Sequence, residues 1–199
     1  MSAADERQPA LLIVIASTRP GRVGLPVGRW FEDRARAHGG FRVSVADLAE
    51  LRLPLVDEPN HPRLRKYTKP HTHKWSEIVE AADAFAFVMP EYNYSFTAPL
   101  KNAIDYLHQE WQYKPVGLVS YGGVSAGTRA AAALRIPLTA IKAYPLAEAV
   151  SIPFVAQFID DDGVLQSNET MDKSADVLLD ELVRVSGALA ALRDRGAGG

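Results

Sequence analysis

The stretch ALLIVIA, residues 10–16, is a continuous apolar run, and the turn-forming stretch STRPGRVG follows it at residues 17–24. A short apolar run that is rich in β-branched residues and does not alternate is typical of a strand buried on both faces, as in a parallel sheet. Residues 25–38 then have the composition of a helix, with Pro26 in its first turn and Gly39 after its end. This part of the chain therefore predicts a buried strand, a loop and a helix.

The alternation of strand and helix continues along the chain. Further strands are expected at residues 41–46, 84–89 and 115–120, and a fifth within residues 147–155. Residues 75–82 form the end of an expected helix, and further helices are expected at residues 97–111 and 128–135. A last helix begins near residue 170, with an apolar stripe of Leu178, Leu182, Val185, Leu189 and Leu192. This order predicts an α/β protein with a parallel sheet.

The length of 199 residues and the hydrophobic content of 47% suit one domain over residues 1–199. We expect residues 1–9 and 193–199 to be frayed tails. Residues 57–74 contain three prolines and many charges, and we expect them to form a long surface loop.

Composition excludes several classes of function. The formal net charge of −2 gives no basic field for nucleic acid. Because the chain has no cysteine, disulfides, thiolate metal sites and dithiol redox motifs are excluded, and redox chemistry would need an added cofactor. The start of the chain lacks the pattern of a signal peptide, and the apolar runs are too short to cross a membrane. We therefore expect a cytoplasmic protein with no membrane partner.

Ligands of parallel sheets bind outside the carboxyl ends of the strands. The loops that leave those ends here are residues 17–24, 90–96 and 121–127. They are also the segments richest in unusual residues, which predicts one composite site.

The first of these loops suits a phosphate group. Ser17 and Thr18 offer hydroxyl groups, Arg19 or Arg22 offers a positive charge, and the start of the next helix adds N–H groups. The loop has neither a Walker A ending nor a G-x-G-x-x-G fingerprint, which favours a monophosphate over a pyrophosphate. The alternative is an ordinary turn with two solvated arginines.

The other two loops suit a flat ligand. Tyr92 and Tyr94 lie in the stretch PEYNYS, residues 90–95, where exposed rings can cover something planar. Gly122 and Gly123 allow backbone N–H groups to approach the edge of such a ligand. The alternatives are tyrosines that pack on the neighbouring helix, and a turn that needs glycine only for its positive φ.

These loops, together with PLKNAID at residues 99–105, resemble the NADPH-dependent FMN reductase family, which includes flavin, quinone, azo-dye and chromate reductases. The resemblance covers residues 11–155. It implies a flavodoxin-like, doubly wound, five-stranded parallel sheet with strand order 2-1-3-4-5 and helices on both faces. It also implies bound FMN, and a homodimer or homotetramer to which the helix at residues 97–111 contributes.

The same resemblance assigns the parts of FMN to the loops. It implies that the phosphate lies among Ser17, Arg19, Arg22 and Val23, to which the hydroxyl group of Thr18 is added from the residues of the loop. The ribityl chain and the ring lie along Pro90, Glu91, Tyr92, Asn93 and Tyr94, and Ser120, Gly122 and Gly123 line the ring. Because the flavin carries the chemistry, no catalytic side chain and no metal is expected.

The resulting hypothesis is an oxidoreductase that passes hydride from NADPH or NADH through FMN to a small acceptor, with ping-pong kinetics. The acceptor is a flavin, a quinone, an azo compound or a metal oxyanion. One alternative is a flavodoxin-type electron carrier without NAD(P)H activity, and another is a binding protein that has lost its flavin. A third is an α/β-hydrolase-like esterase, because Gly123-x-Ser125-x-Gly127 fits a nucleophile elbow. In that fold the histidine follows the serine, whereas all five histidines here precede Ser125.

Overall fold

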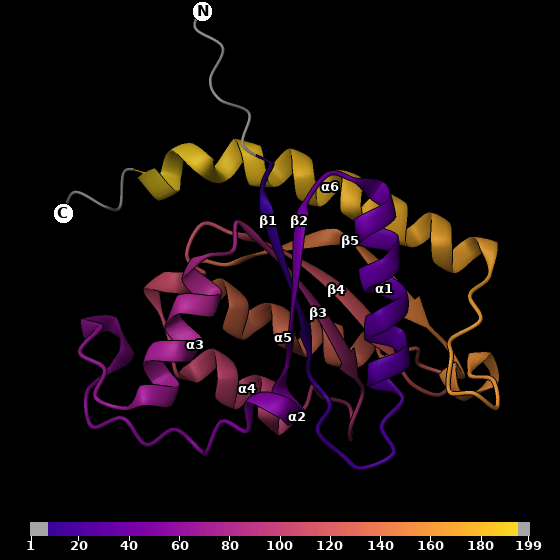
Figure 1. The fold of residues 1–199 in the computed structure, drawn as a ribbon, viewed down its shortest axis with the longest axis horizontal. Helices are drawn as coiled ribbons and strands as arrows, with labels where there is room; N and C mark the ends of the chain where they lie inside the picture. The colour runs from indigo at the N-terminus through magenta and orange to yellow at the C-terminus, as the bar shows by residue number, and fades with distance from the viewer. Residues whose placement is uncertain (1–7, 195–199) are drawn as a thin grey trace, which may run out of the picture.

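Five parallel strands form one sheet in the computed structural model of the chain, which describes residues 8–194 (Figure 1). The strand order is β2-β1-β3-β4-β5, and every neighbouring pair is parallel. This confirms the predicted fold class and strand order. The strands are β1 (Ala10–Ile15), β2 (Arg42–Asp47), β3 (Ala84–Pro90), β4 (Pro115–Tyr121) and β5 (Tyr144–Ile152).

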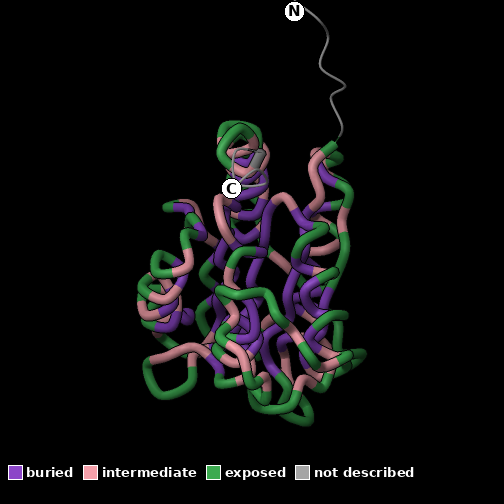
Figure 2. The backbone as a smooth tube through the Cα atoms, turned by 90° about the vertical axis from the view of Figure 1, so that its left-hand side faces the viewer, coloured by how far each residue is buried: buried purple, intermediate pink, exposed green. Residues whose placement is uncertain are grey.

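Burial explains which strands the sequence predicted well. β3 and β4 are buried over their whole length, and β1 is buried in all but its first residue. Figure 2 shows these buried segments running through the centre of the molecule. The edge strands β2 and β5 are only partly buried, so their apolar pattern is weaker. The fifth strand accordingly begins at Tyr144, three residues before the predicted range.

Helices cover both faces of the sheet. On one face, α1 (Gly24–His38) and α6 (Glu169–Asp194) pack against alternate residues of the strands through Phe31 and Leu178. On the other face, α3 (Pro70–Glu80), α4 (Ala98–Asp105) and α5 (Thr128–Ala140) contribute Trp75, Leu100 and Leu134. The short helix α2 (Leu48–Leu51) follows β2. None of the helices within residues 8–194 is long and apolar enough to cross a membrane.

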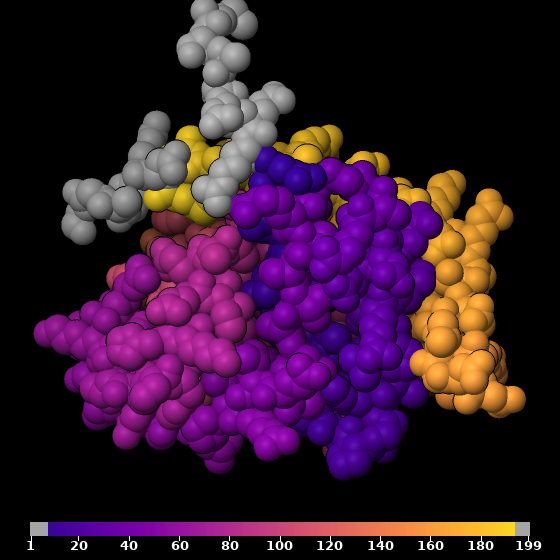
Figure 3. Space-filling view, viewed as in Figure 1, coloured from indigo at the N-terminus to yellow at the C-terminus, as the bar shows by residue number. Residues whose placement is uncertain are grey.

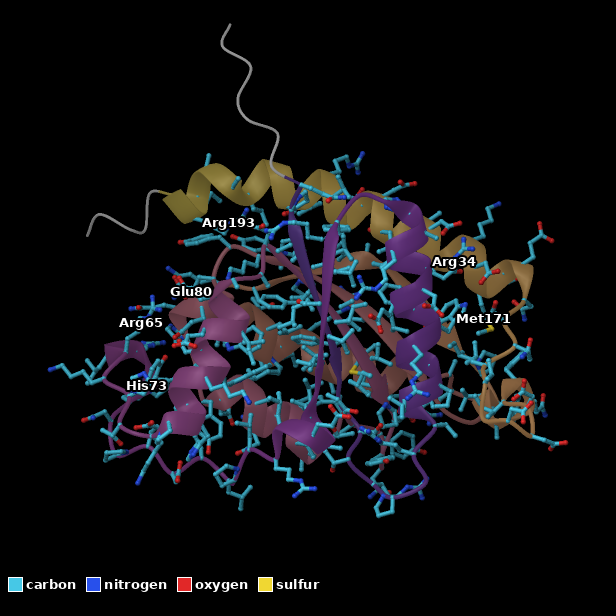
Figure 4. The ribbon with its side chains drawn as sticks, viewed as in Figure 1. Arg34, Arg65, His73, Glu80, Met171 and Arg193 are labelled. Atoms are coloured by element: carbon cyan, nitrogen blue, oxygen red, sulfur yellow. The ribbon has the colours of Figure 1, made fainter. Side chains whose placement is uncertain are left out.

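The expected loop at residues 57–74 is shorter than predicted, because α3 begins at Pro70, where proline suits the first helical position. Before it lies the 3-10 turn η1 (Pro62–Leu64). The side chain of Glu58 holds this segment together by accepting hydrogen bonds from the N–H groups of Thr68 and Lys69. Arg65 reaches Glu80 at the end of α3 at 3.1 Å (Figure 4). In the space-filling view this segment and α3 cover the left part of the molecule (Figure 3).

The expected helix at residues 97–111 is also too long, because α4 ends at Asp105. Trp111 lies in the 3-10 turn η2 (Gln109–Trp111) and folds back so that its Nε1 donates to the carbonyl of Ile104 at 3.2 Å. Its ring packs against Trp75 and Phe85 in the core. Burying this ring requires the chain to leave the helical path.

The last helix begins close to the predicted position, but its apolar stripe differs. Leu178 and Leu182 are buried, whereas Leu192 is 38% exposed, and Ala175 and Leu179 complete the buried face. The helix extends to Asp194, so Arg193, expected in a frayed tail, is part of α6 and contacts Asp83 (Figure 4). Gln8 and Pro9, also expected in a frayed tail, are held in place, since the carbonyl of Pro9 accepts a hydrogen bond from the N–H group of Arg42 at 2.9 Å. Residues 1–7 and 195–199 lie outside the described residues.

Candidate functional site

The carboxyl ends of β1, β3 and β4 bring the three predicted loops together at one edge of the sheet. The hydroxyl group of Thr97, after the second loop, donates to the carbonyl of Ala16 at the end of β1 at 2.9 Å. The N–H group of Glu91 donates to the carbonyl of Tyr121 at 3.1 Å. The hydroxyl group of Tyr121 reaches Ser17 Oγ at 3.2 Å. These hydrogen bonds join each loop to its neighbours.

The first loop is built around a close contact between Ser17 and Tyr121. Ser17 is buried, and a Cβ at Gly24 would overlap its Oγ and lie 2.5 Å from the hydroxyl group of Tyr121. Glycine at position 24 therefore allows the start of α1 to approach the end of β1. The residue before the helix, Val23, provides no side-chain cap. The first N–H groups of α1 thus remain available to an anion at this helix end.

The two arginines of the first loop differ in their surroundings. Arg22 donates two hydrogen bonds of 2.5 Å to the carboxylate of Asp47 and one of 2.7 Å to the carbonyl of Ser17. The hydrogen bond that Arg22 donates to the Asp47 carboxylate raises the pKa of Arg22, so its guanidinium group stays charged. Arg19 is exposed, and its side chain has no hydrogen bond or ion pair to any residue that the structure describes. Thr18 is exposed beside it.

The second loop is a tight two-residue turn. Tyr92 and Ser95 exchange backbone hydrogen bonds of 2.9 and 3.0 Å. Asn93 and Tyr94 between them have φ values of 50° and 67°, which are the positive values of a type I′ turn. Tyr92 is 40% exposed and Tyr94 is 67% exposed, so neither ring is buried in the core. The ring of Tyr94 instead lies against the guanidinium group of Arg129 on α5, 4.2 Å from its centroid.

Glu91 connects the second loop to the third. Its carboxylate accepts hydrogen bonds from the backbone N–H of Arg129 at 3.1 Å and from the guanidinium group of Arg129 at 3.0 Å. Burial opposes the charge of Glu91, but the hydrogen bonds that its carboxylate accepts from the Ser125 hydroxyl group and from Arg129 prevail and lower its pKa. The carboxylate therefore remains ionised at neutral pH and caps the start of α5.

The third loop contains open space above Gly123. The positive φ values in this loop belong to Ala126 and Gly127, so the turn does not need glycine at position 122 or 123 for that reason. A Cβ at Gly123 would meet no atom within 4 Å. Across residues 8–194, the N–H groups of Gly123 and Val124 have no hydrogen-bond acceptor. Ser120, which is buried, instead supports the loop from below by donating to the carbonyl of Ala126 at 2.9 Å.

These observations fit a flavin at this edge of the sheet. Uncapped N–H groups with Thr18 and Arg19 suit its phosphate, and the free N–H groups beside the open space at Gly123 suit the edge of its ring. Most of the other residues that were assigned to FMN from the sequence lie on the same three loops. Arg22 and Ser17 lie deeper, and they contact protein groups.

Four contributors to this edge were missed in the sequence. Thr97 had a recognisable signal, because a threonine before Ala-Pro is a typical N-cap, and its Oγ1 accepts from the N–H group of Leu100. Asp47 directly follows a strand predicted at residues 41–46, which indicates the site edge but does not identify Arg22 as its partner. Tyr121 and Arg129 gave no usable signal, because their partners are 104 and 38 residues away.

Comparison with known proteins agrees with this geometry. The family model of NADPH-dependent FMN reductases matches residues 9–157. The chain belongs to this family. The resemblance stated from the sequence is thereby confirmed, as are the predicted enzyme class, an oxidoreductase, and the predicted use of FMN and NAD(P)H. The family acts on small-molecule acceptors.

Relatives of this FMN reductase family member include an NAD(P)H-dependent FMN reductase of Nectria sp, 34% identical over 153 residues, which are 73% of this chain and 76% of the relative. One from Schizosaccharomyces pombe is 36% identical over 121 residues, 60% of each chain. The solved structure of a flavoenzyme NAD(P)H:(acceptor) oxidoreductase from Paracoccus denitrificans has a TM-score of 0.71 at 20% identity. The match covers 90% of this chain and 98% of that one, and it shows that the two share a fold.

Ser125 does not have the surroundings of a hydrolase nucleophile. The carboxylate of Glu91 interacts with the Ser125 hydroxyl group, but it also accepts two hydrogen bonds from Arg129. No histidine forms a hydrogen bond with Ser125 among the residues that the structure describes. With the family established, the esterase alternative is discarded.

Proposed function

We propose that this FMN reductase family member binds FMN across the three loops and uses it to pass electrons from NADPH or NADH to a small acceptor. The observation that carries the proposal is the open space above Gly123, where the turn itself does not require glycine. Bound FMN supplies the hydride chemistry, and the chain binds and orients it.

The phosphate end of the site would be held by Arg19, by the hydroxyl group of Thr18 and by the N–H groups around Val23 and the first turn of α1. Arg22 would act from beneath the loop, because its guanidinium group is committed to Asp47 and to the carbonyl of Ser17. This arrangement fixes the loop before the ligand arrives.

The ring end would lie between the second and third loops. Pro90, Glu91, Tyr92, Asn93 and Tyr94 would line one side, and Ser120, Gly122 and Gly123 the other. Free N–H groups at Gly123 and Val124 would donate to the ring edge and favour its reduced, negatively charged form. Tyr92 and Tyr94 would shape the face on which nicotinamide and acceptor bind in turn, which gives ping-pong kinetics.

The test is the anaerobic visible spectrum of the purified protein, reconstituted with FMN, before and after addition of NADPH. A bound-flavin spectrum that bleaches rapidly supports the proposal. Bound flavin that stays oxidised with NADPH and with NADH favours an electron carrier. If no FMN binds, the proposed site is wrong. Acceptors are then compared in the same assay as a quinone, free FMN, an azo compound and chromate.

We also propose that the chain forms a homodimer or homotetramer in which α4 contributes to the interface. A groove of about 430 Å³ runs beside α4 and is lined mainly by apolar groups, including Leu53, Leu55 and Pro99. Leu55, which lines this groove, is 83% exposed, and an exposed apolar groove of this kind suits a protein interface. Leu55→Asp should shift the mass measured by light scattering toward the monomer, whereas a monomeric wild-type protein would refute the assembly.

A further inference from the structure

We propose that Arg129 is a positioning residue, which fixes the ring of Tyr94 across the second and third loops and thereby prepares a flat face for FMN. The effect on FMN rests on the function proposed above. The contact between Arg129 and Tyr94 belongs to the protein alone and does not depend on that function.

Tyr94 needs an external support. It occupies the second position of the type I′ turn with a φ of 67°, a conformation that bulky side chains rarely adopt. Tyr94 is 67% exposed, so the core does not fix its ring. Without a partner, the side chain would sample several rotamers, and ordering it would oppose ligand binding.

Arg129 provides that support. Its guanidinium carbon lies 4.2 Å from the centroid of the Tyr94 ring, within the range of a cation–π contact. A planar guanidinium group can lie flat on an aromatic ring, which a lysine ammonium group cannot do. The rest of the ring remains accessible because Tyr94 is largely exposed.

Glu91 in turn fixes Arg129. The Glu91 side chain is only 8% exposed, and it binds both the backbone and the guanidinium group of Arg129. Glu91 belongs to the second loop and Arg129 to the first turn of α5, directly after the third loop. The chain of contacts from Glu91 through Arg129 to Tyr94 therefore closes the second loop onto the third.

The same contacts argue against direct binding of an anionic substrate by Arg129. Its charge is already balanced by Glu91 at 3.0 Å. Arg129 is therefore assigned to placing Tyr94, and its effect on binding must pass through that ring.

A double-mutant cycle tests this assignment. Arg129→Ala, Tyr94→Ala and the double variant are compared with the wild-type protein by FMN titration and by the fluorescence of bound flavin, which a stacked tyrosine quenches. Arg129→Ala should weaken FMN binding about fivefold and raise the bound-flavin fluorescence. In the Tyr94→Ala background, the same substitution should change FMN affinity less than about twofold. An equal effect in both backgrounds overturns the proposal.

Further variants separate positioning from general structure. Tyr94→Phe keeps the ring and should retain the effect of Arg129→Ala, and Arg129→Lys should rescue binding only in part. Arg184→Ala removes an exposed arginine that is paired with Glu181 on α6, and it should leave FMN binding unchanged.

Urea unfolding of the same cycle without FMN distinguishes the two proposals. Coupling between Arg129 and Tyr94 in the apo-protein, together with coupling in FMN affinity, supports the inference. Coupling in the apo-protein with an unchanged FMN affinity overturns the positioning role and leaves the proposed function intact. A wild-type protein that unfolds cooperatively but binds no FMN overturns the proposed function, and with it the role of Tyr94 toward the flavin.

Discussion

Replacing Gly123 by valine should weaken FMN binding and leave the stability of the fold unchanged, because the valine side chain enters the open space above the third loop. A Cβ at this position meets no protein atom within 4 Å, and the φ of Gly123 is not in the left-handed region. The free energy of unfolding should therefore change by no more than about 0.5 kcal/mol. The valine methyl groups would project into space that the proposed flavin ring occupies, and such overpacking costs about 1–3 kcal/mol. This corresponds to FMN binding that is weaker by about 5- to 150-fold.

Gly127→Ala is the matched control in the same loop, because this substitution should lower the stability of the fold. Gly127 has a φ of 80°, and its Cβ would lie 2.7 Å from both the Cβ of Ser120 and the backbone nitrogen of Tyr121. The left-handed conformation costs about 1–2 kcal/mol for an alanine, and the overlap adds to it. Gly127→Ala should thus lower the unfolding free energy by about 2 kcal/mol or more.

Two measurements check this pair. Urea unfolding of the apo-proteins gives stability, and titration followed by flavin fluorescence gives FMN affinity. If Gly123→Val binds FMN as tightly as the wild-type protein, the flavin ring does not occupy the space above Gly123. If it unfolds as easily as Gly127→Ala, the glycine serves the backbone, and the structural argument for the ring site fails.

Three other substitutions test the remaining parts of the fold and site. Arg19→Ala removes an exposed charge without protein partners, so FMN affinity should fall about tenfold or more in the same titration, with unchanged stability in urea. An affinity equal to that of the wild-type protein would show that Arg19 does not belong to the phosphate site. Asp47→Ala leaves Arg22, whose side chain is 14% exposed, without its partner, and it should lower the unfolding free energy by about 2–3 kcal/mol. The control Glu32→Ala, in an exposed helical pair, should lower it by about 0.5 kcal/mol or less. Similar losses in the two variants would contradict the stabilising role of the Arg22–Asp47 pair. Burial opposes ionisation of Glu58, but hydrogen bonds from backbone N–H groups lower its pKa from 4.5 to about 2, so its stabilisation is present above pH 4.5 and is lost as pH falls toward 2. The stability difference between wild type and Glu58→Gln should shrink across that range, and a constant difference would refute the assignment.

The fold was predictable where the burial of an element produces a simple pattern of apolar residues in the sequence. The run at residues 10–16 identified β1 because both faces of that strand are covered by helices. Only the second half of α3 was predicted, because two polar residues, Thr72 and Ser76, share its buried face with Trp75 and Val79. α4 ends before Trp111 because the Trp111 ring packs into the core, a contact that the spacing of apolar residues along the chain does not reveal.

The site was predictable as a set of loops but not as a set of contacts. Strand order alone brings the three loops to one edge, since parallel strands end on the same side. The ion pair of Arg22 with Asp47 joins residues 25 positions apart. The sequence therefore offers no means to decide whether Arg19 or Arg22 is free to bind the phosphate. The close approach that Gly24 allows is likewise a long-range feature, because the groups it approaches are Ser17 and Tyr121, 104 residues apart.

The type I′ turn at Asn93 and Tyr94 also determines which amino acids this loop can tolerate. Both positions have positive φ, a geometry that favours glycine, asparagine and aspartate. At position 93 the resident asparagine agrees with this preference, whereas at position 94 the resident tyrosine opposes it. In a library that samples every amino acid at both positions, selection for folding alone should enrich glycine and asparagine at position 94. Enrichment of aromatic residues there under selection for activity would therefore measure the functional demand for the ring directly against the conformational preference of the backbone.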